Sequence, residues 1–309
     1  MINSGAKNPV PSNQIWYTTY TGLVDVPFND NFGASLISNV YENGTGIMTF
    51  DGDIDTIPSH AFMDNELNSR FASLMFPDTI TNVETYAFVD NQYIDYINLG
   101  NGVTIIEQKA FYNCQASEII LGNKLQTIGN GAFSGCSNLT SITIPDSVTK
   151  IGVESFNNCT SLASVSLGKS ITSIGQMAFY NCDSLTEITI PKGVTSIEYA
   201  TFRSCNKLAS VTIPDTVTTI ILNAFYNCDN LTEITLPNSV TTIGDYAFRN
   251  CTSLTSVYCK ATTPPTGGYS MFNNNASARK IYVPMTSVDA YKSADYWSDY
   301  ADAIVGYNF

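Results

Sequence analysis

A small residue followed by Phe recurs along most of the chain at an almost fixed step. From Phe133 to Phe248 the step is always 23 residues, and a Cys follows each of these Phe residues by three positions. The earlier steps are 26, 23 and 22 residues, and Asn65 and Asn91 take the place of the Cys in the first two copies. A fixed period of this length is typical of a solenoid, in which each turn of chain packs only against its neighbours.

One repeat, from Leu139 to Thr160, shows what each turn contains. Ile142 and Ile144 alternate with small polar residues, which predicts a strand with one buried face. Pro145 ends this strand, and a second, shorter apolar pair follows it. Phe156 and Cys159 are three residues apart, which predicts a helical or 3₁₀ turn. Each repeat can bury its apolar side only by stacking on the next one.

The two apolar strand positions can be followed through the whole array. They predict eleven strands, which would form a parallel sheet roughly 50 Å wide at about 4.8 Å per strand. The pairs are Met48/Phe50, Leu74/Phe76, Ile97/Leu99, Ile119/Leu121, Ile142/Ile144, Val165/Leu167, Ile188/Ile190, Val211/Ile213, Ile234/Leu236, Val257/Cys259 and Ile281/Val283.

The spacing Ile-x-Ile-Pro, Val-x-x-Ile-Gly and Ala-Phe-x-x-Cys resembles the BspA-like leucine-rich repeats of bacterial surface proteins, from about Gly46 to Pro284. The resemblance implies a right-handed leucine-rich-repeat solenoid with its parallel sheet on the concave side and short strands and 3₁₀ or helical turns on the convex side. It also implies an exported protein that works in adhesion or protein binding. Glu107, Glu198 and Ile221 replace the Gly of Ile-Gly, so we expect that Gly to serve packing rather than a positive φ.

The ends of the array need caps, because each exposes a cross-section of the core. Ile15 to Val26, with Gly22 in the turn, and Asn39 to Phe50, with the turn signal Asn43-Gly44, predict two hairpins. Ser287 to Val305 predicts a helix that starts at Ser287 and buries Val288, Tyr291, Trp297, Tyr300 and Ile304. The predicted organisation is a linker (1–14), capping hairpins (15–45), the repeat array (46–284) and a helical cap (285–309).

The chain contains eight Cys, seven of them locked to the repeat period. Equivalent atoms on adjacent turns lie about 4.8 Å apart, whereas Cβ atoms joined by a disulfide lie roughly 3.8 Å apart. Zinc needs four ligands that converge on one point, and these thiols lie along a line. We therefore expect a ladder of buried free thiols, with no metal and no cofactor.

Charge excludes several classes of partner. The net charge is -13, whereas nucleic acids and anionic membranes bind clusters of Lys and Arg. No apolar run is long enough for a transmembrane helix. The first 14 residues are polar, so either the protein is cytosolic or the sequence starts after a removed signal or lipid anchor. Following the resemblance, we expect an extracellular or cell-surface protein that is anchored as a lipoprotein. We also expect a monomer.

Two groups of residues could suggest chemistry, but neither carries a strong signal. His60 is the only histidine and has no partnered nucleophile or acid at a family spacing. Asp51, Asp53 and Asp55 look like the start of a calcium loop, but the Glu that should end such a loop is replaced by Phe62. We expect these acids to face solvent and the protein to be no enzyme.

The outward positions of the long strands are mostly Ser, Thr and Glu, which cross-strand stacking explains. Large residues gather only in the N-terminal third of the array. They predict a binding patch on three successive strands, made of Met75, Tyr96, Asn98, Glu118 and Ile120. Packing of these residues against the N-terminal cap is the competing explanation. A protein ligand is the favoured partner. Two alternatives remain: a carbohydrate surface that uses Tyr96, Tyr258 and the terminal aromatic residues for sugar stacking, and a passive spacer.

Overall fold

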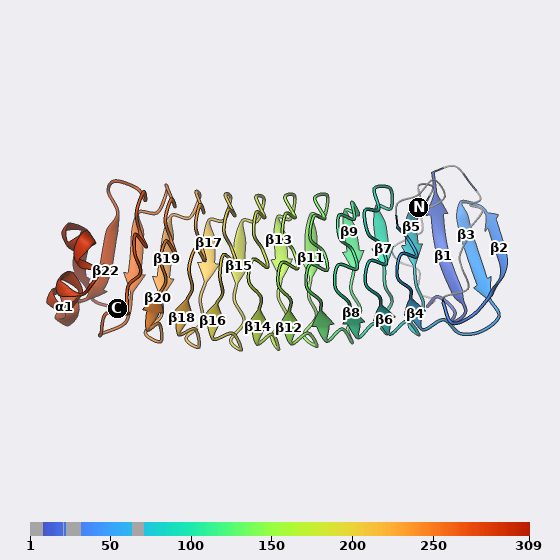
Figure 1. The fold of residues 1–309 in the computed structure, drawn as a ribbon, viewed down its shortest axis with the longest axis horizontal. Coiled ribbons are helices and arrows are strands. Elements are labelled where there is room, and N and C mark those ends of the chain that lie inside the picture. Colours follow the sequence, from blue (N-terminus) through green and yellow to red (C-terminus); the bar gives the residue numbers. More distant parts are fainter. Residues whose placement is uncertain (1–8, 21, 23–31, 64–70) are drawn as a thin grey trace. The chain divides into compact units, whose positions relative to one another are not determined.

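A computed structural model describes residues 9–20, 22, 32–63 and 71–309. It divides into two units, Met1–Thr160 and Ser161–Phe309, each with its own internal packing. In each unit the repeating turn of chain carries a long strand and a two-residue short strand, joined by loops (Figure 1). The chain is a solenoid of parallel strands, as the sequence predicts.

In the first unit, the long strands β5, β7 and β9 are parallel neighbours, and the short strands form a second parallel ladder, β4-β6-β8-β10-β12. The strands are β1 Gln14–Thr19, β2 Leu36–Glu42, β3 Thr45–Phe50, β4 Thr56–Ile57, β5 Phe71–Met75, β6 Asn82–Val83, β7 Tyr96–Asn98, β8 Ile105–Ile106, β9 Glu118–Ile120, β10 Thr127–Ile128, β11 Ser141–Thr143 and β12 Lys150–Ile151.

The N-terminal strands extend the sheet in the order β2-β3-β1-β5, and every pairing among these four strands is antiparallel. The hairpin β2–β3 is confirmed, with positive φ at Asn43 and Gly44 in its turn. The prediction that Met48 and Phe50 lie on the first strand of the parallel sheet is wrong, because β1 separates β3 from β5. The second strand expected for the first hairpin, residues 23–26, lies outside the described residues.

In the second unit, the long strands pair as β15-β17 and as β19-β21-β22-β23, and the short strands as β16-β18-β20. The elements are β13 Ser164–Ser166, β14 Ser173–Ile174, β15 Glu187–Thr189, β16 Ser196–Ile197, β17 Ser210–Thr212, β18 Thr219–Ile220, β19 Glu233–Leu236, β20 Thr242–Ile243, β21 Ser256–Cys259, β22 Lys280–Pro284, η2 Met285–Ser287, α1 Val288–Ser293, η3 Ser298–Ala303 and β23 Ile304–Tyr307.

The recurring Phe forms a column of stacked rings through the core of each unit. In the first unit the rings of Phe62, Phe88, Phe111, Phe133 and Phe156 follow one another at centroid distances of 5.0, 4.6, 5.1 and 5.1 Å. In the second unit Phe179, Phe202, Phe225, Phe248 and Phe272 follow at 5.6, 5.3, 5.2 and 5.4 Å. All of these rings are fully buried, so the period of the sequence is the period of this column.

The Cys three residues after each Phe has a defined bonding role. The thiol of Cys136 donates a hydrogen bond to the carbonyl of Phe111 in the preceding turn, at 3.1 Å. Cys159, Cys205, Cys228 and Cys251 repeat this bond to Phe133, Phe179, Phe202 and Phe225. Where the sequence has Asn instead, the side-chain amide of Asn91 donates to the Phe62 carbonyl at 2.8 Å. All eight cysteines are buried and none forms a disulfide, which confirms the predicted ladder.

The segment around Phe and Cys differs from the helical or 3₁₀ turn that the spacing predicts. Its hydrogen bonds do join residues three apart, for example Asn157 N to Glu154 O and Cys159 N to Phe156 O. However, φ is positive at Glu154 and at Asn158, which breaks a helix into separate turns. Asn tolerates the left-handed region better than most residues, which explains why Asn so often precedes the Cys.

The Gly of Ile-Gly serves packing, as the sequence predicts. Neither Gly129 nor Gly244 has a positive φ. A Cβ at Gly129 would lie 2.6 Å from the backbone carbon of Glu107, and one at Gly244 would lie 2.5 Å from the backbone nitrogen of Leu222. The absence of a side chain therefore lets adjacent turns of chain approach closely at these two positions.

The C-terminal segment packs over the last turn of the second unit. The buried rings of Trp297 and Tyr300 lie 6.0 and 5.7 Å from that of Phe272, and Trp297 donates its indole N–H to the Pro265 carbonyl. The prediction of one helix through Val305 is wrong, because α1 ends at Ser293 and Ile304 opens β23, which is parallel to β22. Ser287 makes no side-chain cap on this helix and donates instead to the Thr262 carbonyl. In the described part of the chain, no helix is both long and apolar enough to cross a membrane.

We expect removal of residues 287–309 to make the protein associate. The deletion exposes Phe272 and leaves β22 as an uncovered edge strand, and such an edge is a template for pairing with another chain. Size-exclusion chromatography with light scattering should show oligomers or aggregates. A monomeric truncation with an unchanged melting temperature would show that this segment is not a cap.

Candidate binding surface

The structure brings together the five residues that the sequence singles out. Met75 ends β5, Tyr96 and Asn98 lie on β7, and Glu118 and Ile120 lie on β9. The parallel register places Met75 beside Asn98, Asn98 beside Ile120, and Tyr96 beside Glu118. These side chains share the outward face, because Leu74, Ile97 and Ile119 between them are buried in the core.

The side chains of this patch become more exposed from β5 and β7 to β9. Met75, Tyr96 and Asn98 are half-buried, whereas Glu118 is exposed and Ile120 keeps 39% of its surface exposed. Burial raises the pKa of the Tyr96 hydroxyl, and the charge of Glu118 raises it further, while a side-chain hydrogen bond with Asn98 acts in the opposite direction. Tyr96 is therefore a neutral hydroxyl at physiological pH, able both to donate and to accept a hydrogen bond.

The outward side chains of the N-terminal strands continue the patch. Trp16 on β1 lies opposite Met75, Ile47 on β3 lies opposite Trp16, and Val40 on β2 lies opposite Ile47. We call the resulting line across six strands the cross-strand row; its members are Val40, Ile47, Trp16, Met75, Asn98 and Ile120. The sequence gives the alternation of Trp16 with Ile15 and Tyr17, but not the insertion of β1 beside β5, so these three residues were not predicted.

The competing explanation, that the large residues pack against the cap, holds for only part of the patch. Met75 and Trp16 are direct neighbours and both are half-buried, so they do cover each other. The cap strand β1 reaches no further than β5, and Ile120 lies two strands beyond it. The cap therefore adds its own apolar side chains to the outward face as well as covering one edge of the array.

The charged residues on the six strands of this face are all acidic. The six strands β2, β3, β1, β5, β7 and β9 carry Glu42 and Glu118 but neither Lys nor Arg. The wider charge balance agrees, since residues 1–160 hold 16 of the 27 acidic side chains and 5 of the 14 basic ones. Between the carboxylates the neighbouring outward positions are hydroxyls, and Thr18 and Ser73 hydrogen-bond to each other at 2.7 Å.

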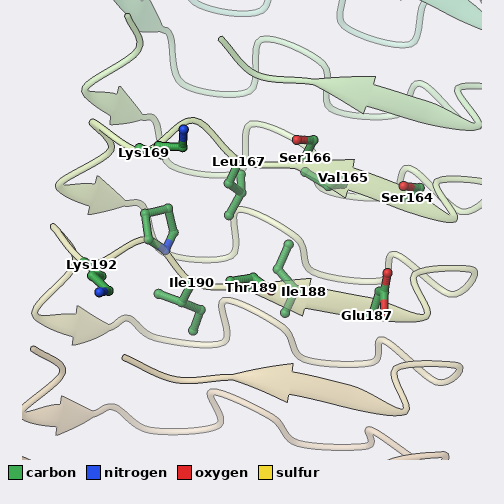
Figure 2. Close-up of a pocket in the computed structure, with 11 residues that line it drawn as sticks. Ser164, Val165, Ser166, Leu167, Lys169, Glu187, Ile188, Thr189, Ile190 and Lys192 are labelled. Atoms are coloured by element: carbon green, nitrogen blue, oxygen red, sulfur yellow. The ribbon is translucent and has the colours of Figure 1, made fainter. Parts of the chain in front are cut away.

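A hollow lies on the long-strand face of the second unit, between β13 and β15 (Figure 2). These strands are not hydrogen-bonded neighbours, and the hollow of about 780 Å³ lies between them. Val165 and Leu167 are half-buried there, although Ile188 and Ile190 in the next turn are only 2% exposed. Figure 2 shows the two lysines of the hollow, at 169 and 192, at one end and Glu187 at the other. No pattern in the sequence predicts this opening.

The remaining candidates, the three Asp residues and His60, are exposed in the described part of the chain. Asp51, Asp53 and Asp55 are exposed, which confirms that they face solvent, and among the described residues no three acids, cysteines or histidines are grouped to hold a metal. His60 lies in a turn at a positive φ, and its Nδ1 is 2.8 Å from the hydroxyl of Ser59. The Ser59 hydroxyl also lies within hydrogen-bond distance of the Thr85 carbonyl, and the side chains of Ser59 and His60 are exposed.

A family model described as "BspA type Leucine rich repeat region" matches residues 55–186 and 172–296, in 6 copies. The chain belongs to the BspA type leucine-rich-repeat family. This match confirms the resemblance read from the repeat, and it covers the Phe column and the long-strand face of both units. The cap strands β1, β2 and β3, which supply half of the cross-strand row, lie outside the matched residues.

Solved structures similar to this BspA type protein are bacterial leucine-rich-repeat proteins. The leucine-rich-repeat protein of T. pallidum shares 22% identity over 73% of this chain and 89% of its own, with a TM-score of 0.49. The pneumococcal vaccine antigen PcpA shares 19% over 83% and 85%, with a TM-score of 0.39. A leucine-rich cell surface protein from Faecalibacterium prausnitzii shares 19% over 79% and 85%, with a TM-score of 0.34. No curated protein matches the chain.

Proposed function

We propose that this BspA type protein is a non-enzymatic binding module that works at the cell surface, in adhesion or protein binding. Leucine-rich repeats generally bind proteins, and the family match supports the same task here. The resemblance to exported surface proteins is the reason for placing it outside the cell. The contact surface we propose is the cross-strand row together with Tyr96 and Glu118.

The cross-strand row is the observation that carries this proposal. Elsewhere in the array the outward positions are mostly Ser, Thr and Glu, which stabilise a sheet and offer little to recognise. Here an indole, a thioether, an amide and aliphatic groups follow one another on adjacent strands. Aromatic side chains and Met are enriched in protein interfaces, and hot spots are rich in Trp and Tyr.

The geometry of the row indicates what kind of partner segment would fit. Six strands span five inter-strand steps, or about 24 Å, and an extended chain rises about 3.3 Å per residue. About seven residues of an extended segment would therefore cross the row. The flanking carboxylates of Glu42 and Glu118 favour a segment that places Lys or Arg beside its apolar side chains. Further contacts would be needed to reach the area of a standard interface.

A passive spacer is the simplest alternative, and it would need no departure from the Ser and Thr pattern on the outward face. A spacer offers no reason for Trp16, Ile47 and Val40 to continue the row into the cap, and Val40 leaves 49% of its surface exposed. Exposed apolar groups that line up across strands favour a binding surface over a spacer.

We expect Trp16→Ala and Tyr96→Ala each to weaken binding of a protein ligand by at least about fivefold, which corresponds to about 1 kcal/mol, as is typical of aromatic anchors. The measurement is surface plasmon resonance of the full chain against a panel of purified extracellular matrix and plasma proteins. Because the face carries only carboxylates, the affinity should also fall as the salt concentration rises.

Thr143→Ala is the matched control, because Thr143 is an exposed outward residue of β11 in the same unit. It should bind like the unmodified protein, and melting temperatures should show that all three variants fold. A ligand whose affinity depends on Thr143 but on neither aromatic residue would place the binding surface on the Thr columns instead. Failure of the whole panel to bind would favour the spacer.

A further inference from the structure

In the second unit the position immediately after the recurring Phe alternates between Tyr and Arg. Its occupants on successive turns of chain are Tyr180, Arg203, Tyr226 and Arg249, and we call them the tyrosine–arginine column. The guanidinium carbon of Arg203 lies 5.7 Å from the ring centroid of Tyr180 and 4.8 Å from that of Tyr226. Because the three residues occupy equivalent positions on successive turns, the guanidinium lies between the two rings.

The column continues into exposed aromatic residues at its C-terminal end. The guanidinium carbon of Arg249 lies 5.2 Å from the ring centroid of Tyr246. The Tyr246 ring meets that of Tyr269 edge-on, with 5.5 Å between the centroids, and Tyr269 keeps 53% of its surface exposed. Tyrosine and arginine are enriched in protein interfaces and in their hot spots. This composition therefore favours a contact surface.

The two guanidinium groups have hydrogen-bonding capacity that the described part of the chain does not use. A guanidinium carries five N–H donors. Those of Arg203 and Arg249 donate no hydrogen bond and form no ion pair with any described residue. Both Nε atoms are buried, whereas the Nη atoms, which are equally unpartnered, are not. Stacking uses the faces of the Arg203 guanidinium and leaves its Nη edge open to solvent.

These arginines are unpaired although the chain contains 27 acidic residues. Two acids on the same turns of chain bond elsewhere. Asp183 accepts a hydrogen bond from Nδ2 of Asn206 at 2.8 Å, and Asp245 accepts one from the backbone N–H of Tyr269 at 2.7 Å. The positive charges of Arg203 and Arg249 therefore remain available to a carboxylate from outside.

We infer that the tyrosine–arginine column binds an acidic segment of a partner protein. A carboxylate meets the Nη edge of a guanidinium through two parallel N–H···O bonds, because the planar fork matches its two oxygens. Tyr226 offers a further donor. Its hydroxyl oxygen accepts a hydrogen bond from Asn250 at 3.1 Å, and its own hydroxyl proton has no acceptor among the residues described. The flanking rings exclude water, which strengthens the contact between opposite charges.

The spacing of the two arginines indicates what kind of segment fits. Arg203 and Arg249 are two turns of chain apart, which corresponds to about 10 Å at about 4.8 Å per turn. In an extended segment, which rises about 3.3 Å per residue, acidic residues two to four positions apart are separated by about 7–13 Å. A long polyanion such as a sulfated polysaccharide fits less well, because the net charge of -13 repels it outside the column.

This inference does not rest on the function proposed for the first unit. The cross-strand row lies in that unit and favours Lys or Arg in its partner, whereas the column lies in the second unit and favours carboxylates. Trp16→Ala should therefore leave binding of an acidic segment unchanged. Failure of the column to bind one would leave the cross-strand row untouched.

The test is fluorescence anisotropy of the full chain with a labelled peptide of alternating Glu and Gly residues, and with the same peptide carrying Gln in place of Glu. We expect the Glu peptide to bind at least about tenfold more tightly than the Gln peptide. Arg203→Gln and Arg249→Gln should each weaken binding of the Glu peptide at least about fivefold. Arg203→Lys should weaken it by a smaller factor, because Lys retains the charge but not the planar fork.

Lys207→Gln is the matched control, because it removes one positive charge from an exposed residue close to Arg203 in the sequence. It should change the affinity by less than about twofold, and melting temperatures should show that each variant folds. Absence of binding by the Glu peptide, equal affinity for both peptides, or equal weakening by Lys207→Gln and Arg203→Gln would overturn the assignment. Tighter binding of a sulfated dextran oligosaccharide than of the Glu peptide, lost in Arg203→Gln, would replace the acidic segment with a polysaccharide.

Discussion

Phe225→Ala should lower the free energy of unfolding of the second unit by about 3–5 kcal/mol, the usual cost of removing a buried Phe ring. The ring is fully buried and stacks on Phe202 at 5.3 Å and on Phe248 at 5.2 Å. Both neighbouring rings are fixed by their own turns of chain, so they cannot close the cavity. The backbone carbonyl that accepts the Cys251 thiol remains in the variant, so the measured loss reports the cavity.

The damage should also be local, because a repeat array couples mainly to nearest neighbours. Hydrogen exchange measured by mass spectrometry should show faster exchange centred on residues 202–248, and chemical denaturation should give the loss of stability. Thr212→Ala, on the exposed side of the same turns, should change neither. An equal loss of protection along the whole chain would argue against nearest-neighbour coupling.

The fold could be predicted from the sequence because one period governs several features at once. The 23-residue step sets the positions of the Phe column, the thiol ladder and the buried residues of both strands. Each of these three features supports the same fold. Packing between turns then leaves little freedom, as the close backbone approach at Gly129 shows. Even the substitution of Asn91 for Cys follows a rule, since both side chains donate a hydrogen bond to the Phe carbonyl of the preceding turn.

The ends could not be predicted as well, because they leave the period. The alternation in Ile15, Trp16 and Tyr17 identifies a strand and its buried face, but pairing partners depend on contacts distant in the sequence. Likewise, Ile304 fits the apolar side of a helix, yet it lies in β23 and pairs with Ile281 of β22. A short apolar run is compatible with both structures, and only packing decides between them.

The candidate binding surface also has a part inside the repeat period that could be predicted and a part outside it that could not. Met75, Tyr96 and Ile120 lie within the period, so their places on neighbouring strands could be predicted and are confirmed. Trp16 and Ile47 join them through strand pairings that no repeat dictates. The sequence pattern therefore underestimates the size of the patch, because its extension into the cap depends on the sheet order.

We expect the array to unfold at a lower alkaline pH than a solenoid that contains no thiols. Burial raises the pKa of the Cys205 thiol to about 12 and that of Cys259 to about 11, and it raises the pKa of Cys228 well above its usual range. In the unfolded chain a thiol ionises near pH 8.5. Below that pH the thiols are protonated in both states, and their contribution to stability is fully present.

Between about pH 8.5 and 11 the unfolded chain releases these protons while the folded chain retains them, so stability falls as the pH rises. Each thiol contributes a slope of about 1.4 kcal/mol per pH unit. The three thiols together give about 4 kcal/mol per pH unit if the second unit unfolds as a whole, against a typical domain stability of 5–15 kcal/mol. Raising the pH from 9 to about 11 is therefore expected to unfold it.

Urea denaturation followed by circular dichroism between pH 7 and 10.5, with a reductant present, measures this slope. Cys205→Val is the informative variant, because Val fills a similar volume but cannot ionise. It loses the hydrogen bond to the Phe179 carbonyl, so it should be less stable at pH 7 by about 1–3 kcal/mol. Its stability should nevertheless fall less steeply with pH, by about 1.4 kcal/mol per unit. Equal slopes in the two proteins would mean that this thiol ionises as readily in the folded chain as in the unfolded one.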